Sequence, residues 1–211
     1  AWTNEGEVGK ALRFDGNDDY LSRISTDSLQ ISTDISIGAW VYLNNTGVEQ
    51  TILGKWDETT GTDDRSYRLW VSSSNKLSFS LSSDGTSGNT YTVTGGTTLL
   101  ANRWYYLSAS ADVGTNMKVY VDAKLDGTDI SGNPSAISAN PSILYIGGKE
   151  NAGGGVDTLL NGRVDEVKIY NYALSEEEVK QDYNQGMAAV MGQSAGNTGS
   201  TAPAGSAAQE Y

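Results

Sequence analysis

The chain has 211 residues, with 26 acidic and 14 basic side chains and a formal net charge of −12. This length suits one well-buried domain, and its 25 glycines favour many turns between short strands. Such an acidic surface repels phosphate backbones, so we expect no binding to nucleic acid. No apolar run approaches the roughly 20 residues of a membrane-spanning helix, so we expect no membrane insertion either.

The chain contains no cysteine and no histidine. The first absence excludes disulfides, thiolate zinc sites and cysteine nucleophiles, and the second removes the commonest general base and transition-metal ligand. Any bound metal should therefore be a hard, oxygen-liking ion, and Ca²⁺ is the one we expect. No basic-then-apolar signal opens the sequence, which we interpret as a sign of a processed product or a fragment.

Much of the chain alternates apolar and polar residues, as expected of strands with one buried face. The predicted strands cover residues 10–14, 20–24, 34–43, 50–55, 66–72, 76–82, 103–111, 117–122 and 143–147, with weaker ones at 91–94 and 124–126. The strand at 34–43 carries Trp40 and Tyr42 opposite its aliphatic face, which predicts a central strand covered on both sides. The strands at 66–72 and 76–82 form a predicted hairpin, in which outward-facing serines indicate exposure to water.

The stretch from Gly162 to Ser175 begins as a further strand and leads into a helix at about residues 175–185. Ser175 and Glu178 form a predicted capping box, in which each side chain accepts the backbone N–H of the other residue. Gly186 is the expected helix stop, because glycine readily takes the left-handed conformation. Many short strands with one short helix predict an all-β fold built as a two-sheet antiparallel sandwich.

The composition changes after the predicted helix. Residues 187–211 are rich in Gly, Ser and Ala, which is typical of a linker or tail. We therefore predict one domain over residues 1–186, followed by this segment.

Asp165 and Glu166 place two carboxylates inside the late strand. One interpretation is a strand with one solvated face. The other is a metal-binding bulge whose partner is the acidic turn at residues 15–19. The residues by themselves leave both interpretations open.

Five stretches together resemble the laminin-G-like family of concanavalin A-like jelly-roll domains. They are residues 9–20 with the sequence F-D-G, 35–41 (ISIGAWV), 103–107 (RWYYL), 143–148 (ILYIGG) and 162–178. The resemblance covers about residues 9–185 in the order that the family shows. It implies two curved antiparallel sheets in a jelly-roll sandwich, and an adhesive or carbohydrate-related setting that is extracellular or at the cell surface. It leaves the ligand open, because the fold hosts many functions.

The resemblance also implies one structural Ca²⁺ between the acidic turn and the late strand. The implied ligands come from Asp15, Asn17, Asp18 or Asp19 and from Asp165, partly through backbone carbonyls. The alternative is that Asp15 and Asp165 only cap turns.

Members of the family usually begin with a strand before the segment that starts here at Ala1. A missing first strand would leave an open edge, which is a site for strand addition. We therefore consider the tail at 187–211 a strand donor, to its own domain or to another copy.

Catalysis is the least favoured function. The available groups would suit a carboxylate-dependent glycoside hydrolase, but no strand carries the E-x-D-x-x-E pattern of jelly-roll glucanases, and the acidic residues fall in predicted loops. These residues are Asp57, Glu58, Asp63, Asp64, Asp84, Glu150 and Asp157. We predict that the chain is not an enzyme.

Two binding functions remain. Our first interpretation is an adhesive or structural module of a larger surface protein or an assembled fibre, with other copies or neighbouring domains as partners. The alternative is a carbohydrate-binding module, in which aromatic rings stack on sugars. Trp56, Trp70 and Tyr91 are the candidate stacking residues, although some of them are expected to pack in the core.

Overall fold

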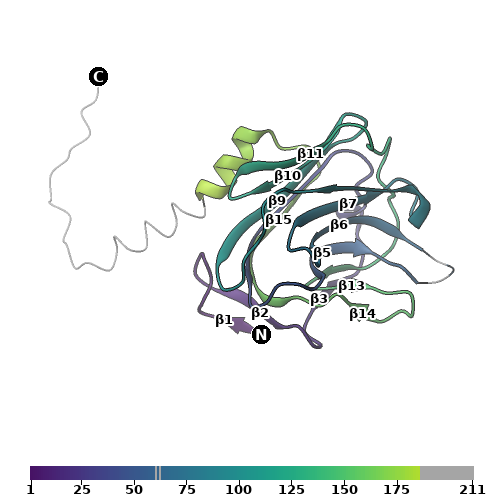
Figure 1. The fold of residues 1–211 in the computed structure, drawn as a ribbon. Coiled ribbons are helices and arrows are strands. Elements are labelled where there is room, and N and C mark those ends of the chain that lie inside the picture. The colour runs from purple at the N-terminus through teal and green to yellow at the C-terminus, as the bar shows by residue number, and fades with distance from the viewer. Residues whose placement is uncertain (60, 62, 186–211) are drawn as a thin grey trace, which may run out of the picture.

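The computed structural model describes residues 1–59, 61 and 63–185, and in this part the chain folds into two packed antiparallel sheets (Figure 1). The strands are β1 (Trp2–Thr3), β2 (Ala11–Asp15), β3 (Leu21–Arg23), β4 (Ile35–Leu43), β5 (Gln50–Trp56), β6 (Arg65–Val71), β7 (Leu77–Ser82), β8 (Thr90–Thr94), β9 (Trp104–Asp112), β10 (Asn116–Val121), β11 (Lys124–Asp129), β12 (Leu144–Ile146), β13 (Lys149–Glu150), β14 (Val156–Asp157) and β15 (Asn161–Tyr170). Two short 3₁₀ helices cover Asp27–Leu29 and Ser87–Asn89. The predicted all-β sandwich is confirmed.

Seven strands form sheet I in the order β1-β2-β15-β4-β9-β10-β11. Six strands form sheet II in the order β3-β12-β5-β6-β7-β8. The remaining pair, β13 and β14, makes a small ribbon of its own. Strands far apart in sequence therefore lie side by side: β15 lies between β2 and β4, and β12 lies between β3 and β5.

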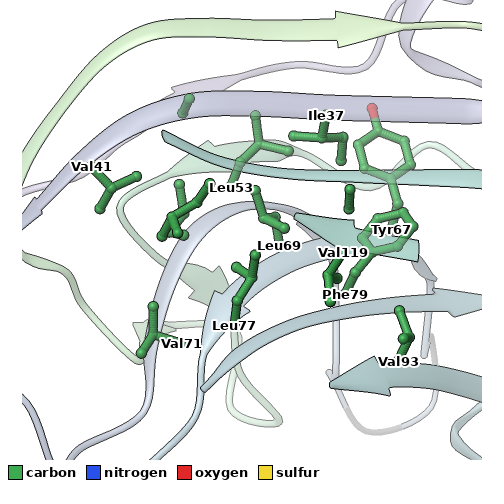
Figure 2. Close-up of a cluster of buried hydrophobic side chains, with 14 of the residues drawn as sticks. Ile37, Val41, Leu53, Tyr67, Leu69, Val71, Leu77, Phe79, Val93 and Val119 are labelled. Atoms are coloured by element: carbon green, nitrogen blue, oxygen red, sulfur yellow. The ribbon is translucent and has the colours of Figure 1, made fainter. Parts of the chain in front are cut away.

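The main core lies between the two sheets, where aliphatic side chains from both inner faces meet (Figure 2). The labelled side chains of Figure 2 come from β4 and β10 of sheet I and from β5, β6, β7 and β8 of sheet II. Every second residue of these strands faces inward, because side chains alternate along a strand. Lys55 is the polar exception: it pairs with Tyr67, which faces the core, and it is fully buried.

A second, aromatic cluster lies on the outer face of sheet I. Trp40, Tyr106 and Tyr120 project outward there and are covered by Leu174 and Val179. This arrangement confirms the predicted central strand with two covered faces. The covering element is helical over residues 176–185 and packs beside β9 and β10 in Figure 1.

The predicted capping box is present at the start of this helix. The N–H of Ser175 donates to Oε2 of Glu178 at 2.8 Å, and the N–H of Glu178 donates to Oγ of Ser175 at 3.3 Å. The predicted stop at Gly186 and the tail at 187–211 lie outside the described residues. Within those residues, no helix has both the length and the apolar character that crossing a membrane requires.

The edge beside β2 is occupied by β1, in which Trp2 pairs with Leu12. This two-residue strand is itself the edge of sheet I, and a strand before Ala1, as the family usually has, is not among the 211 residues of this sequence. The proposed donation of a strand by residues 187–211 falls outside the described part and stays a prediction.

Candidate functional site

The outer face of sheet II, which no helix of the described chain covers, carries two rows of mostly polar side chains. Residues that pair directly across neighbouring strands point to the same side of a sheet. One row runs through Ser22, Tyr145, Gly54, Arg68, Ser80 and Thr92, and the next runs through Thr51, Trp70, Ser78 and Thr94. Because side chains alternate between the two faces of β6, β7 and β8, and the residues between these face the core, the side chains of both rows point away from the core.

Trp70 is the half-exposed aromatic residue on this face. The guanidinium of Arg68 lies over its ring at 4.7 Å, and its indole Nε1–H donates to Oγ of Ser80 at 3.1 Å. Ser80 is in turn hydrogen-bonded to the hydroxyl of Thr92 at 2.8 Å, and Ser78 to that of Thr94 at 2.9 Å. The indole is therefore held in one orientation beside an array of hydroxyl groups.

The serines of β7 differ from the expectation. Ser78 and Ser80 face outward as predicted, but both are buried rather than exposed to water. The physical reason is cross-strand covering: Trp70 from β6 and the exposed threonines of β8 lie over them. The hydroxyls that face water on this part of the sheet are those of Thr92 and Thr94.

Arg68 is buried, and its Nε and Nη2 donors have partners within the protein. Its Nε–H donates to Oγ1 of Thr51 at 2.9 Å, and its Nη2 donates to Glu49 at 2.7 Å and to Thr158 at 3.2 Å. Burial lowers the pKa of this guanidinium, while the hydrogen bond and charge of Glu49 raise it. Arg68 thus anchors the loop before β15 and supports Trp70.

Trp56 does not offer a platform for a sugar. It is only 4% exposed, its Nε1–H donates to Oε1 of Glu58 at 3.0 Å, and Arg65 lies over its ring at 5.9 Å. Lys149 bridges Glu58 at 2.6 Å and Asp157 at 2.9 Å. Burial raises the pKa of Glu58, but the hydrogen bonds from Lys149 and Trp56 outweigh it and leave that pKa below its usual value.

Tyr91 also differs from the expectation. It pairs with Leu81, which faces the core, and its half-buried ring packs against the main cluster between the sheets. Tyr91 and Trp70 therefore lie on opposite faces of sheet II. The sequence did hold a signal for this side: β8 alternates as Thr-Tyr-Thr-Val-Thr, which places Tyr91 on the same face as the buried Val93.

Two tyrosines that the sequence did not single out lie at the other end of the outer face. Tyr20, 44% exposed, packs edge-on against Tyr145 with ring centroids 5.7 Å apart. Burial and the charge of Glu150 raise the pKa of Tyr145 to about 12. Burial and the charge of Asp57 raise the pKa of Glu150. Tyr145 alternates with core residues in β12, which was the available signal for its outward direction.

The predicted Ca²⁺ ligands are not brought together. Asp15 pairs with Asn161, whereas Asp165 lies four residues further along β15, which is about 13 Å at the rise of a strand. In the described part of the chain, no group of three or more acidic, His or Cys residues is arranged to hold a metal ion. The implied donor set therefore does not fit one ion in this arrangement, and Ca²⁺ binding stays a prediction.

Each part of that set has a structural role. Oδ1 of Asp15 accepts the N–H of Asn17 at 2.8 Å, which lowers the pKa of Asp15 and closes the turn where Asp18 is exposed and Asp19 half-exposed. Asp165 is buried, and its Oδ2 accepts the N–H of Val8 at 2.8 Å.

Of the two interpretations of Asp165 and Glu166, the structure has a bulge at this point, and metal binding by it stays a prediction. The register of β15 on β4 shifts between Asp165 and Lys168, and the backbone of Glu166 has φ 48°. Oδ1 of Asp165 accepts the N–H of Glu166 at 2.9 Å within the bulge.

Comparison with known proteins gives a family and a fold. Residues 15–180 match the family described as the concanavalin A-like lectin/glucanases superfamily. A search of curated proteins gave no match.

Three solved structures illustrate the similarity of fold. The binding domain of Paraclostridial Mosquitocidal Protein 1 has a TM-score of 0.66 at 17% identity, over 88% of this chain and 45% of that one. The Ruminococcus gnavus IT-sialidase CBM40, bound to α2,3-sialyllactose, has a TM-score of 0.64 at 15% identity, over 81% and 96%. The heptameric SAP-like pentraxin of Limulus polyphemus has a TM-score of 0.58 at 18% identity, over 80% and 78%.

Proposed function

The chain belongs to the concanavalin A-like lectin/glucanases superfamily, and from this premise we propose that it is a carbohydrate-binding module without catalytic activity. The R. gnavus neighbour is a carbohydrate-binding module by name, and its structure holds a sialylated sugar. These findings favour the carbohydrate-binding alternative over the adhesive or structural module that we first expected. A sequence identity of 15% supports a shared fold only, so the proposal depends on the residues of this chain.

The observation that carries the proposal is the fixed, half-exposed indole of Trp70 beside the exposed hydroxyls of Thr92 and Thr94. An aromatic face meets the C–H groups of a pyranose ring, and neighbouring hydroxyls exchange hydrogen bonds with its O–H groups. Arg68 and Ser80 hold the indole in place, so little side-chain freedom is lost when a sugar binds.

The charges around this face favour a neutral sugar. Its three cations, Arg65, Arg68 and Lys149, are each paired with at least one carboxylate. The acids gathered there are Glu49, Asp57, Glu58, Asp63, Glu150 and Asp157. Carboxylates therefore outnumber cations, and an anionic sugar would meet repulsion without a free cationic partner.

We propose binding without catalysis because the acids are used in other ways. Glycoside hydrolysis needs two carboxyl groups that face each other across a sugar-sized cleft. Lys149 holds Glu58 and Asp157 in ion pairs. Oδ1 of Asp57 accepts the N–H of Thr59 at 2.6 Å, and the carboxylate of Glu150 is hydrogen-bonded to Tyr145.

The direct test is binding of neutral oligosaccharides on a glycan array, followed by calorimetry with wild type and Trp70→Ala. We expect Trp70→Ala to weaken binding up to about tenfold, since a lost aromatic contact costs about 0.5–1.5 kcal/mol. Trp2→Ala is the matched control, because Trp2 is 72% exposed on the edge strand of sheet I. Sialyllactose should bind more weakly than lactose.

The proposal fails if no glycan binds, or if both tryptophan variants bind as wild type does. Binding of sialyllactose that exceeds binding of lactose would leave the function in place and contradict the preference for neutral sugars. Three earlier expectations accompany the proposal as predictions: an extracellular or cell-surface location, a structural Ca²⁺, and contacts with other copies or neighbouring domains.

A further inference from the structure

A groove of about 400 Å³ lies between the loop that precedes β9 and the turn that joins β10 to β11. It is lined by Thr97, Thr98, Leu100, Arg103, Tyr105, Val121, Asp122, Lys124, Leu125 and Asp126. None of these residues belongs to the two rows that carry the proposed sugar site. The groove is in the size range of small-molecule sites.

The groove has an aromatic floor and apolar walls. The ring of Tyr105 is buried beneath the guanidinium of Arg103, which lies 4.3 Å from the ring centroid. The hydroxyl of Tyr105 accepts the N–H of Leu100 at 2.9 Å, which fixes the loop above the floor. Leu100 and Leu125 are 58% and 47% exposed, so two large apolar side chains face water at one recessed place.

The acids of the groove hold its walls in place. Oδ1 of Asp126 accepts the N–H of Thr97 at 3.0 Å and its hydroxyl at 2.6 Å. Oδ1 of Asp122 accepts the N–H of Tyr106 at 3.0 Å, and its Oδ2 lies 3.6 Å from Nη2 of Arg103. Both carboxylates therefore have partners that belong to the protein.

The two cationic side chains of the groove have fewer partners within the protein than its acids do. The side chain of Lys124 is exposed, and its ammonium forms no hydrogen bond or ion pair with any residue of the described chain. Arg103 has a single long ion pair, and a guanidinium has five N–H donors. The guanidinium of Arg103 lies over the ring of Tyr105 and is exposed, so it can bind a carboxylate through two parallel hydrogen bonds.

We propose that this groove is a second binding site, which takes a ring-sized organic anion. The anionic group lies between Arg103 and Lys124, and the apolar face of the ring lies against Leu100 and Leu125. A hexuronate has this chemistry, because it combines a carboxylate with the C–H face of a pyranose. The site is independent of the sugar site on sheet II, and it differs from that site in selecting a charged ligand.

The test is a titration of ¹⁵N-labelled protein, followed by amide shifts, with three probes. D-Glucuronate carries both the ring and the carboxylate, D-glucose carries the ring alone, and acetate carries the carboxylate alone. We expect saturable shifts for glucuronate at Thr97, Leu100, Lys124 and Leu125, and binding at least about tenfold weaker for glucose and acetate. Added salt should weaken the binding of glucuronate, because the contact is ionic and exposed.

Lys124→Gln should weaken glucuronate about tenfold or more, which is the usual effect of losing one charge-assisted hydrogen bond. Lys10→Gln removes an exposed lysine that precedes β2, on the far side of sheet I, and should leave binding unchanged. Both side chains are exposed, so both variants should fold.

Three results would overturn the proposal: shifts of equal size with glucose, shifts confined to residues outside the groove, or unchanged affinity in Lys124→Gln. Loss of neutral-sugar binding in Trp70→Ala bears only on sheet II. The two sites therefore succeed or fail separately.

Discussion

The buried ammonium of Lys55 should make the stability of this domain rise with pH above neutrality. Lys55 lies in β5 and is fully buried, and Nζ donates to the backbone oxygen of Asn140, to Oδ1 of Asn140 at 2.8 Å and to Oγ of Ser142 at 3.3 Å. No carboxylate of the described chain forms an ion pair with Lys55, although the negative charge of Asp64 favours its protonated form. Burial lowers the pKa of Lys55 to about 8, against the opposing charge of Asp64.

The direction of this pH dependence follows from the number of protons bound in the folded and unfolded states. Between pH about 8 and the ordinary lysine pKa of 10.5, the folded chain has released this proton while the unfolded chain keeps it. Unfolding then takes up a proton, so the free energy of unfolding increases with pH in this window. For one group, the free energy of unfolding can rise by at most about 1.4 kcal/mol per pH unit. Water penetration around Lys55 reduces this slope, so we expect a total rise of about 2 kcal/mol over the window.

The assay is urea unfolding at a series of pH values from about 7 to about 9.5, with Lys55→Met beside wild type. The series stops there because unfolded tyrosines lose protons near pH 10 while buried ones such as Tyr145 do not, which lowers stability above that pH. Lys180→Met, which changes an exposed helical lysine, should keep the wild-type slope. A flat or falling wild-type curve, or a rise that persists in Lys55→Met, would refute the reasoning.

Two further predictions concern backbone strain and the expected metal. Gly147→Ala should lower the free energy of unfolding by about 3 kcal/mol, because this residue has φ 85° and an added Cβ would lie 2.7 Å from the ring of Phe14. The control is Gly9→Ala, which has φ 73° but open space around the added Cβ, and it should lower the free energy of unfolding by about 1 kcal/mol. Equal losses in urea unfolding would show that crowding against Phe14 has no effect. Asp165→Asn should lower the free energy of unfolding by about 0.5–1.5 kcal/mol in EDTA, because it replaces a charged acceptor of the part-buried N–H of Val8 by a neutral one. If thermal melts show stabilisation by Ca²⁺ that both Asp15→Asn and Asp165→Asn abolish, the two residues share an ion, which would contradict their separation along β15.

Local patterns predicted the elements well. The two-faced apolar pattern of residues 34–43 indicated a covered central strand, and β4 lies between β15 and β9 with one face in the core and Trp40 under the helix. The capping box at Ser175 was also readable, because its partners lie three residues apart in the chain. Such features depend on neighbours in sequence, and these are visible without a fold.

The site was less predictable, because exposure of a side chain depends on distant segments. Trp56 and Trp70 were both candidate stacking residues, yet Glu58 and Arg65 cover Trp56 while Trp70 stays half-exposed. The serines of β7 alternate as in an exposed face, but residues of both adjacent strands bury them. The groove beside Lys124 joins two loops that no sequence spacing relates.

Composition and period-two alternation thus determined the class of fold, the positions of the strands and the chemistry that is absent, since each of these is a property of the chain itself. Only the tertiary structure decided which aromatic rings reach the surface and which charges pair. It also decided that Asp15 and Asp165 lie apart, because register in a sheet depends on strands that come from opposite ends of the sequence.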